Sequence, residues 1–239
     1  MMDNRKHLRR LSRREMLAAA GVGALAATVG AKLFGHQRVA ANDDSPAGIS
    51  PDEALQKLME GNKRYVEQKR TYPAQSLQRL TEIAYSQHPF AVILGCADSR
   101  VCAEHIFDRG LGDLFVVRVA GHILDSAVLG SIEYAAEHLG VPLILVLGHE
   151  RCGAVKAALE GKPVPGQIGN LVAAINPALT KAKGQAGDLL DNAVRANVKL
   201  VVDQLKSSQP ILAELLKEGR LKIVGARYDL DSGKVETIA

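Results

Sequence analysis

Two short stretches of this 239-residue chain carry side chains that could do chemistry. The first is Cys96-Ala97-Asp98-Ser99-Arg100 and the second is His149-Glu150-Arg151-Cys152-Gly153. Together they supply two thiols and one imidazole, which are soft to borderline ligands that suit Zn²⁺. Three protein ligands with the fourth position left to water are typical of a catalytic zinc site. We therefore predict zinc bound by Cys96, His149 and Cys152.

An Asp–Arg pair stands beside the first thiol. Asp98 follows Cys96 by two residues, so its carboxylate could reach the fourth zinc position or the water there. Arg100 could hold that carboxylate in a bidentate pair, which would keep Asp98 ionised and turned away from the metal. If the pair opened, Asp98 could displace the water and become a zinc ligand in a closed form. A purely structural salt bridge is the alternative.

The spacing of the ligands constrains how they meet. His149 and Cys152 are three residues apart, so at a helix start both side chains would lie on one side of the backbone. Cys96 would come from the end of a neighbouring strand. The alternative for either ligand cysteine is a small buried hydrophobic residue, which is what we predict for Cys102. Two thiolates cancel the charge of Zn²⁺, so this zinc should acidify its bound water less than a zinc held by three His. We therefore expect activity to be best at neutral to alkaline pH.

Both ligand stretches follow the same kind of sequence. An aliphatic run and a glycine precede each first ligand, in Phe90–Gly95 before Cys96 and in Pro142–Gly148 before His149. Runs of this kind are typical of strands that are buried on both faces. Open α/β sheets place their sites at the carboxyl ends of such strands. We also expect each glycine to let the backbone turn sharply beneath its ligand.

The rest of the chain alternates between strand-like and helix-like patterns. Ser50-Pro51 supplies a helix cap and a proline at the first helical position. This alternation predicts an α/β fold, in which a parallel-core β-sheet is flanked by helices and preceded by an N-terminal helical arm. We expect helices over residues 50–69, 76–86, 126–138, 153–160, 168–182, 188–207 and 211–218, and strands over 90–95, 114–119, 142–148, 221–228 and 235–238.

The formal net charge of +4 is unevenly placed. Residues 1–41 hold eight Lys/Arg and two Asp/Glu, a balance of +6, and the other 198 residues hold 22 and 24, a balance of −2. The basic surplus therefore belongs to residues 1–41, and we predict no nucleic-acid partner.

Residues 42–239 are long enough for one sizeable core, so we expect a single zinc domain there. Three cysteines cannot all form intrachain disulfides, which favours metal ligation.

Residues 1–41 have the pattern of an export signal. A basic segment with Arg13-Arg14 precedes an Ala/Gly-rich stretch, and Val39-Ala40-Ala41 offers residues that a signal peptidase reads. This resembles a twin-arginine-type signal peptide. We predict a periplasmic or extracellular protein, with cleavage after about Ala41 and no stable membrane association afterwards. The alternative is a membrane anchor, although the glycines and Lys32 make the stretch weakly hydrophobic.

The motifs resemble those of the beta-class carbonic anhydrase family, from about Asp52 to the C-terminus. The matching segments are Cys96-Ala97-Asp98-Ser99-Arg100, Ala103-Glu104, Phe107-Asp108, Gly112-Asp113-Leu114-Phe115-Val116-Val117-Arg118, Ala120-Gly121, Gly148-His149 and Cys152-Gly153-Ala154. The resemblance implies zinc on Cys96, His149 and Cys152, with Asp98 and Arg100 as a catalytic dyad. It implies reversible hydration of carbon dioxide to bicarbonate. It also implies a homodimer or a dimer-based higher oligomer, in which the N-terminal helices embrace the partner.

The expected mechanism is attack of zinc-bound hydroxide on CO₂, with Asp98 orienting the hydroxide through a hydrogen bond. Two alternatives stay open. One is a carbonyl sulfide or carbon disulfide hydrolase on the same site, and the other is a non-catalytic zinc-stabilised binding module whose fourth position Asp98 fills. His122 could be a proton shuttle, but we expect a packing role because it follows Ala120-Gly121 in a predicted tight loop.

Overall fold

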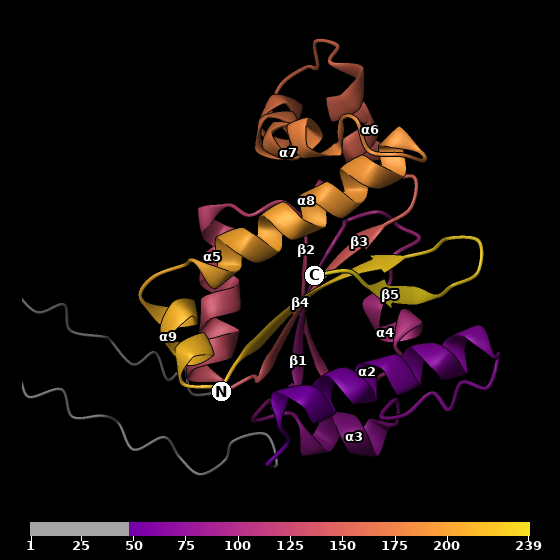
Figure 1. Cartoon of the computed structure of the whole chain (residues 1–239). Helices are drawn as coiled ribbons and strands as arrows, with labels where there is room; N and C mark the ends of the chain where they lie inside the picture. The colour runs from indigo at the N-terminus through magenta and orange to yellow at the C-terminus, as the bar shows by residue number, and fades with distance from the viewer. Residues whose placement is uncertain (1–47) are drawn as a thin grey trace, which may run out of the picture. The chain divides into compact units, whose positions relative to one another are not determined.

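A computed structural model describes residues 48–239 (Figure 1). The predicted leader, residues 1–41, lies outside the described residues. The described part contains a five-stranded sheet in the order β2-β1-β3-β4-β5. Its strands are β1 (Ala91–Gly95), β2 (Leu114–Arg118), β3 (Leu143–His149), β4 (Lys222–Tyr228) and β5 (Val235–Thr237).

The first four strands of the sheet are parallel, and β5 pairs antiparallel with β4. The predicted parallel core is therefore confirmed, with one antiparallel strand at its edge. A short turn through Asp231 and Gly233 joins β4 to β5, and a connection this short can join only antiparallel neighbours. In register, Gly95 of β1 lies opposite Leu147 of β3, so the ends of these two strands are adjacent.

Helices cover both faces of the sheet (Figure 1). Val92 and Ile144 point to the face that packs against α5, α8 and α9, whereas Ile93 and Leu145 point to the face that packs against α2 and α4. The central strands are thus buried on both sides, as their continuous aliphatic runs predict. The helices are α2 (Pro51–Val66), α3 (Leu77–Glu82), α4 (Ala103–Ile106), α5 (Ser126–Glu133), α6 (Gly153–Glu160), α7 (Ile168–Ala182), α8 (Leu189–Lys206) and α9 (Ile211–Lys217).

The helix boundaries follow local signals. Ser50 caps α2, and its hydroxyl accepts from the amide of Glu53 while the Glu53 carboxylate accepts from the Ser50 amide. The helix ends at Val66, earlier than expected, and Gln68 takes a positive φ of 57° just beyond it. The expected helix over 126–138 divides into α5 and a π-helical turn, Tyr134–His138.

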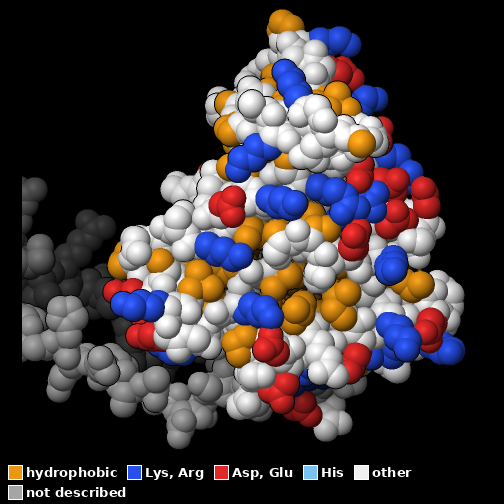
Figure 2. All heavy atoms as spheres, in the orientation of Figure 1, with side chains coloured by type: hydrophobic (Ala, Val, Ile, Leu, Met, Phe, Trp, Pro, Cys, Tyr) orange, Lys and Arg blue, Asp and Glu red, His pale blue; other side chains and the backbone are white. Residues whose placement is uncertain are grey.

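Figure 2 shows apolar side chains gathered between α8 and α2, on the side where the sheet ends in β4 and β5.

Within residues 48–239, no helix has both the length and the apolar character needed to cross a membrane.

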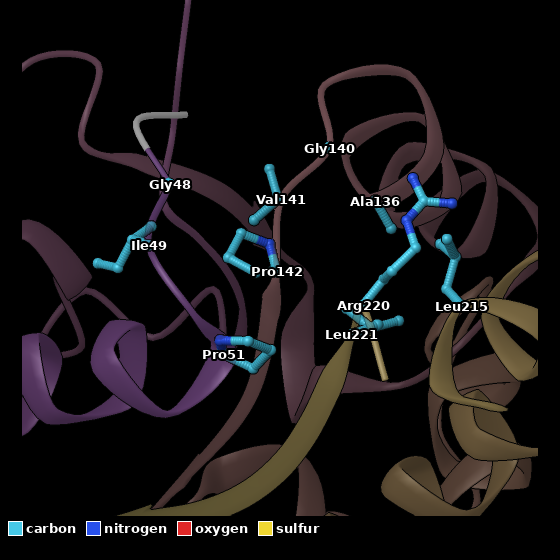
Figure 3. A pocket seen from close by; sticks show the side chains of 10 residues that line it. All are labelled: Gly48, Ile49, Pro51, Ala136, Gly140, Val141, Pro142, Leu215, Arg220 and Leu221. Carbon is cyan, nitrogen blue, oxygen red and sulfur yellow. The ribbon is translucent and has the colours of Figure 1, made fainter. Parts of the chain in front are cut away.

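A cavity of about 260 Å³ lies at the start of β3, the end of the strand remote from His149 (Figure 3). Its walls are mainly apolar and include one cation, Arg220. The lining residues are Gly48, Ile49, Pro51, Ala136, Gly140, Val141, Pro142, Leu215, Arg220 and Leu221.

Candidate metal centre

The three predicted ligands meet at the carboxyl end of the sheet. Their ligand atoms lie within 4.8 Å of one another, and Cys96, His149 and Cys152 are each 4% exposed or less. Cys96 follows β1, His149 ends β3 and Cys152 caps the start of α6. The parallel pairing of β1 with β3 brings the first two together. The expected helical spacing of His149 and Cys152 is wrong, because His149 belongs to β3 and a turn at residues 150–151 brings Cys152 back to it. The structure therefore places the predicted residues in one cluster.

The His149 imidazole is prepared to bind a metal. Its Nδ1 lies 2.9 Å from the backbone oxygen of Glu150, an acceptor, so Nδ1 carries the proton. Its Nε2 is then unprotonated and carries a free lone pair, and this atom is buried without a hydrogen-bond partner. A buried polar atom with no partner is costly, and a neutral imidazole oriented by a carbonyl at its other nitrogen is a common arrangement around zinc. The donor set fits Zn²⁺.

The two cysteines differ in how readily they ionise. The adjacent Cys152 and His149, with the amides of Asp98 and Gly121 at 3.4 and 3.3 Å from Sγ, lower the pKa of Cys96. The same proximity to Cys96, together with burial, raises the pKa of Cys152. Two buried thiolates this close repel each other, so both can be ionised only when a cation is held between them.

Asp98 and Arg100 form the predicted bidentate pair. The Arg100 guanidinium donates from Nε to Oδ1 at 2.9 Å and from Nη2 to Oδ2 at 2.7 Å, and the Arg100 amide donates to Oδ1 at 3.0 Å. Arg100 holds the pKa of Asp98 well below its usual range. Oδ2 also lies 3.9 Å from Nε2 of His149, so an ionised acceptor faces the ligand cluster. The closed form, in which Asp98 would itself be a ligand, stays a prediction.

The glycines before the ligands do not act as expected. Neither Gly95 nor Gly148 has a positive φ, so the predicted sharp turn beneath each ligand is wrong. Gly148 instead permits close packing, because a Cβ there would lie 2.4 Å from Cγ2 of Val198 on α8. Gly95 has open space where a Cβ would be. The two glycines correctly mark the place of the ligands. Gly148, however, is needed because α8, which lies far along the chain, packs closely against it.

The motif that contains Arg118 did not reveal that this side chain braces the first ligand loop. Arg118, at the end of β2, donates from Nε to the carbonyl of Cys96 at 3.0 Å and from Nη2 to the carbonyl of Asp98 at 2.6 Å. These two bonds fix the backbone on either side of Ala97. The available signal was the place of Arg118 at the end of a strand next to β1.

A second brace holds the loop between His149 and Cys152. Arg151 takes a left-handed conformation, with φ of 51°, and its guanidinium pairs with both carboxylate oxygens of Asp231 at 2.9 and 2.6 Å. The Glu150 carboxylate accepts from the amide of Leu230 at 3.2 Å. The turn between β4 and β5 thus anchors this ligand loop.

Two further residues were singled out from the sequence. Cys102 is partly exposed, with Sγ 3.5 Å from a carboxylate oxygen of Glu104, so the prediction of a buried residue is wrong. It is the N-cap residue of α4 and is of intermediate burial. His122 is fully buried, and burial lowers its pKa to about 4. A neutral ring with no exposed surface agrees with packing rather than proton shuttling.

Comparison with known proteins relates this geometry to a family. A family model described as carbonic anhydrase matches residues 91–235. The carbonic anhydrase 2 of Mycobacterium tuberculosis is 45% identical over 189 residues, which are 77% of this chain and 91% of that protein. A solved structure of the β-carbonic anhydrase of Coccomyxa with acetazolamide matches with a TM-score of 0.62 and 29% identity, over 77% of this chain and 86% of that one. A tetrameric β-carbonic anhydrase of Sordaria macrospora has the same fold at 22% identity, with a TM-score of 0.63, over 77% and 96% of the two chains.

Proposed function

The chain belongs to the β-class carbonic anhydrase family, and we propose that Cys96, His149 and Cys152 hold its zinc while Asp98 and Arg100 carry the chemistry. The enzyme uses zinc and catalyses the reversible hydration of carbon dioxide to bicarbonate and a proton. One observation supports the residue assignment above all others. Two thiols and an unpartnered imidazole nitrogen converge at the end of the sheet, beside a carboxylate that is held ionised.

Zinc bound by these ligands would supply the Lewis acidity that makes water a strong nucleophile near neutral pH. Asp98 accepts a hydrogen bond from the O–H of the attacking nucleophile and thereby turns a free lone pair of that oxygen towards carbon dioxide. Arg100 keeps Asp98 ionised, so the carboxylate acts as an acceptor over the whole neutral range. Holding the reactants in this orientation removes part of the barrier that they would face in solution.

The first test measures metal content and turnover on one sample of the purified protein. We expect about one zinc per chain, and CO₂ hydration in a stopped-flow assay that rises from about pH 6.5 to about pH 9. Zinc without turnover at any pH would contradict the catalytic assignment and favour a binding module. Turnover of carbonyl sulfide above that of CO₂ would assign the site to a sulfide hydrolase.

A homodimer, or a larger oligomer built from dimers, is part of the proposal. The edge strand β2 is only half-buried, and α3 exposes Leu77 at 84% and Leu80 at 52%. An apolar face and an open strand edge on one side of the sheet suit a second copy of the chain. Light scattering after size-exclusion chromatography should give at least twice the chain mass, and the double substitution of Leu77 and Leu80 by Glu should lower it. A monomeric wild-type protein would contradict this proposal.

Export through a twin-arginine route is also proposed. It rests on Arg13-Arg14, the weakly hydrophobic stretch after them and the small residues near Ala41. Fractionation of a bacterial host with a twin-arginine pathway should find the protein outside the cytoplasm, with its N-terminus near residue 42. Substituting both arginines by lysine should retain it in the cytoplasm. Unchanged export of that variant would contradict the route, and an intact leader in the membrane fraction would favour the anchor.

A further inference from the structure

A buried amide on α8 lies beneath the loop that supports Cys96. Asn197 is fully buried, and its Nδ2 donates to the carbonyl of Gly121 at 2.9 Å. The same nitrogen lies 3.0 Å from Nε2 of His122. Asn197 is 76 positions from Gly121 and 75 from His122 in the chain, so these contacts are a product of the fold.

The hydrogen-bond roles in this group are fixed by chemistry. The Gly121 carbonyl can only accept, so the side of the Asn197 amide that faces it must be the NH₂ group. The same NH₂ group faces Nε2 of His122, so Nε2 must accept and the ring proton must sit on Nδ1. His122 is therefore neutral in one tautomer, held by Asn197.

Gly121 connects this amide to the metal centre. Its backbone N–H donates to Sγ of Cys96 at 3.3 Å, while its carbonyl accepts from Asn197. Gly121 has a positive φ of 71°, and an added Cβ would lie 2.8 Å from Cδ1 of Ile175. A glycine in this conformation can turn easily, so its orientation depends on the bonds made at its two ends. Asn197 supplies one of those bonds.

The group has polar atoms that simple packing does not explain. Nδ1 of His122 and Oδ1 of Asn197 are both buried without a hydrogen-bond partner. Each such atom costs roughly 1–3 kcal/mol, and an apolar pair of similar shape would avoid that cost. Buried polar groups of this kind call for a role other than stability. The contact of the group with the Cys96 sulfur, through Gly121, offers that role.

We propose that Asn197 is a positioning residue for the Cys96 thiolate. It fixes the peptide after Gly121, and this keeps the Gly121 N–H directed at the sulfur. The inference rests on the proposed zinc site. Residues that orient a metal ligand through hydrogen bonds commonly contribute about 10–100-fold to metal affinity. An N–H bond to a thiolate also lowers the energy of the sulfur lone pairs, which a spectroscopic metal can report.

The test compares the same substitutions at two buried asparagines. Asn62 is 3% exposed, and its Nδ2 likewise contacts two acceptors, here the backbone carbonyls of Ile106 and Gly233, neither of which belongs to a ligand loop. The variants are Asn197→Asp and Asn62→Asp, which keep the shape, and Asn197→Leu and Asn62→Leu, which keep the branching at Cγ but carry no polar atom. Each full-length protein is assayed for zinc affinity by chelator competition. Its Co²⁺ form is examined for the thiolate-to-cobalt absorption band, and its thermal unfolding is recorded.

We expect both Asn197 variants to lose zinc affinity by about 10-fold or more, with both Asn62 variants within about 2-fold of the wild type. The cobalt band should move to longer wavelength in the Asn197 variants alone, because the thiolate loses a hydrogen bond. Equal loss of affinity at the two positions, or an unmoved band in a folded Asn197→Asp protein, would overturn the proposal. A wild-type protein that binds no zinc would instead refute the proposed metal site.

Discussion

The two ends of the sheet differ in what they place together. At the carboxyl end, the ligand atoms of Cys96, His149 and Cys152 converge within 4.8 Å, and all three residues are buried. At the other end of β3, a cavity of about 260 Å³ is lined mainly by apolar side chains with Arg220 at one side (Figure 3). Convergent donors, rather than empty volume, therefore mark the proposed site of chemistry. A small substrate such as CO₂ needs a reactive centre more than a large pocket.

The ends also differ in how their side chains are held. At the carboxyl end, Arg118 and Arg151 brace the two ligand loops, and Asp98 pairs with Arg100. Around the cavity, Leu215 is 4% exposed and supplies packing alone. Substitutions at the first end should change chemistry with modest loss of stability, and substitutions at the second should do the reverse.

Replacing Cys96 by Ser should have the largest effect on activity. Ser is a poor zinc ligand, so the protein should lose most of its zinc and at least about 10³-fold in CO₂ hydration. Stopped-flow assays with metal analysis measure both losses. A Cys96→Ser protein with full activity would show that the reactive centre lies elsewhere.

The Asp98→Asn substitution should come next. The amide keeps the size of the carboxylate, but it replaces one of the two acceptor oxygens by a donor and loses the charge that pairs with Arg100. We expect about 10²-fold lower kcat with zinc content unchanged. Metal analysis of the same sample is the control. Unchanged kcat would reduce the pair to a structural salt bridge.

The Arg100→Gln substitution should produce a pH effect. Arg100 lowers the pKa of Asp98, so its removal should return that pKa towards the ordinary range of a carboxyl group. Because the proposed role of Asp98 is that of an ionised acceptor, activity should then begin to fall at a higher pH on the acid side, below about pH 5. At neutral pH we expect about 10-fold loss from poorer orientation of the carboxylate. If the acid limb of the pH–activity profile does not move in a zinc-loaded variant, that result would contradict this role of Arg100.

The Leu215→Ala substitution should leave activity per folded molecule unchanged. Leu215 lines the cavity at the far end, and its truncation should enlarge that cavity and lower the free energy of unfolding by about 2–4 kcal/mol. Denaturant unfolding and stopped-flow assays give the two quantities. A large loss of kcat in the folded variant would show that the two ends of the sheet are coupled, and would contradict the division between chemistry at one end and packing at the other.

Local patterns predicted most of the fold. The aliphatic runs marked β1 and β3, and the Ser50-Pro51 signal marked the start of α2. The ligands were predictable because residue type and spacing alone suggest zinc. Cys102 was misjudged because a free cysteine has no local pattern that separates a buried position from a partly exposed one.

The supports of the site were not predictable in this way. Arg118 reaches Cys96 across 22 positions, Arg151 reaches Asp231 across 80, and Asn197 reaches Gly121 across 76. Each pairing depends on the tertiary fold rather than on a short motif. Gly148 is a similar case, since its role is set by Val198 on α8.

The most direct test of the central claim is zinc K-edge X-ray absorption of the wild-type protein. The proposed site predicts two sulfur ligands at about 2.3 Å, with nitrogen and oxygen completing four-coordination at about 2.0–2.1 Å. That result would assign the metal to Cys96, Cys152 and His149, the only combination of its kind found among residues 48–239. A zinc shell of nitrogen and oxygen without sulfur would place the metal elsewhere and contradict the account.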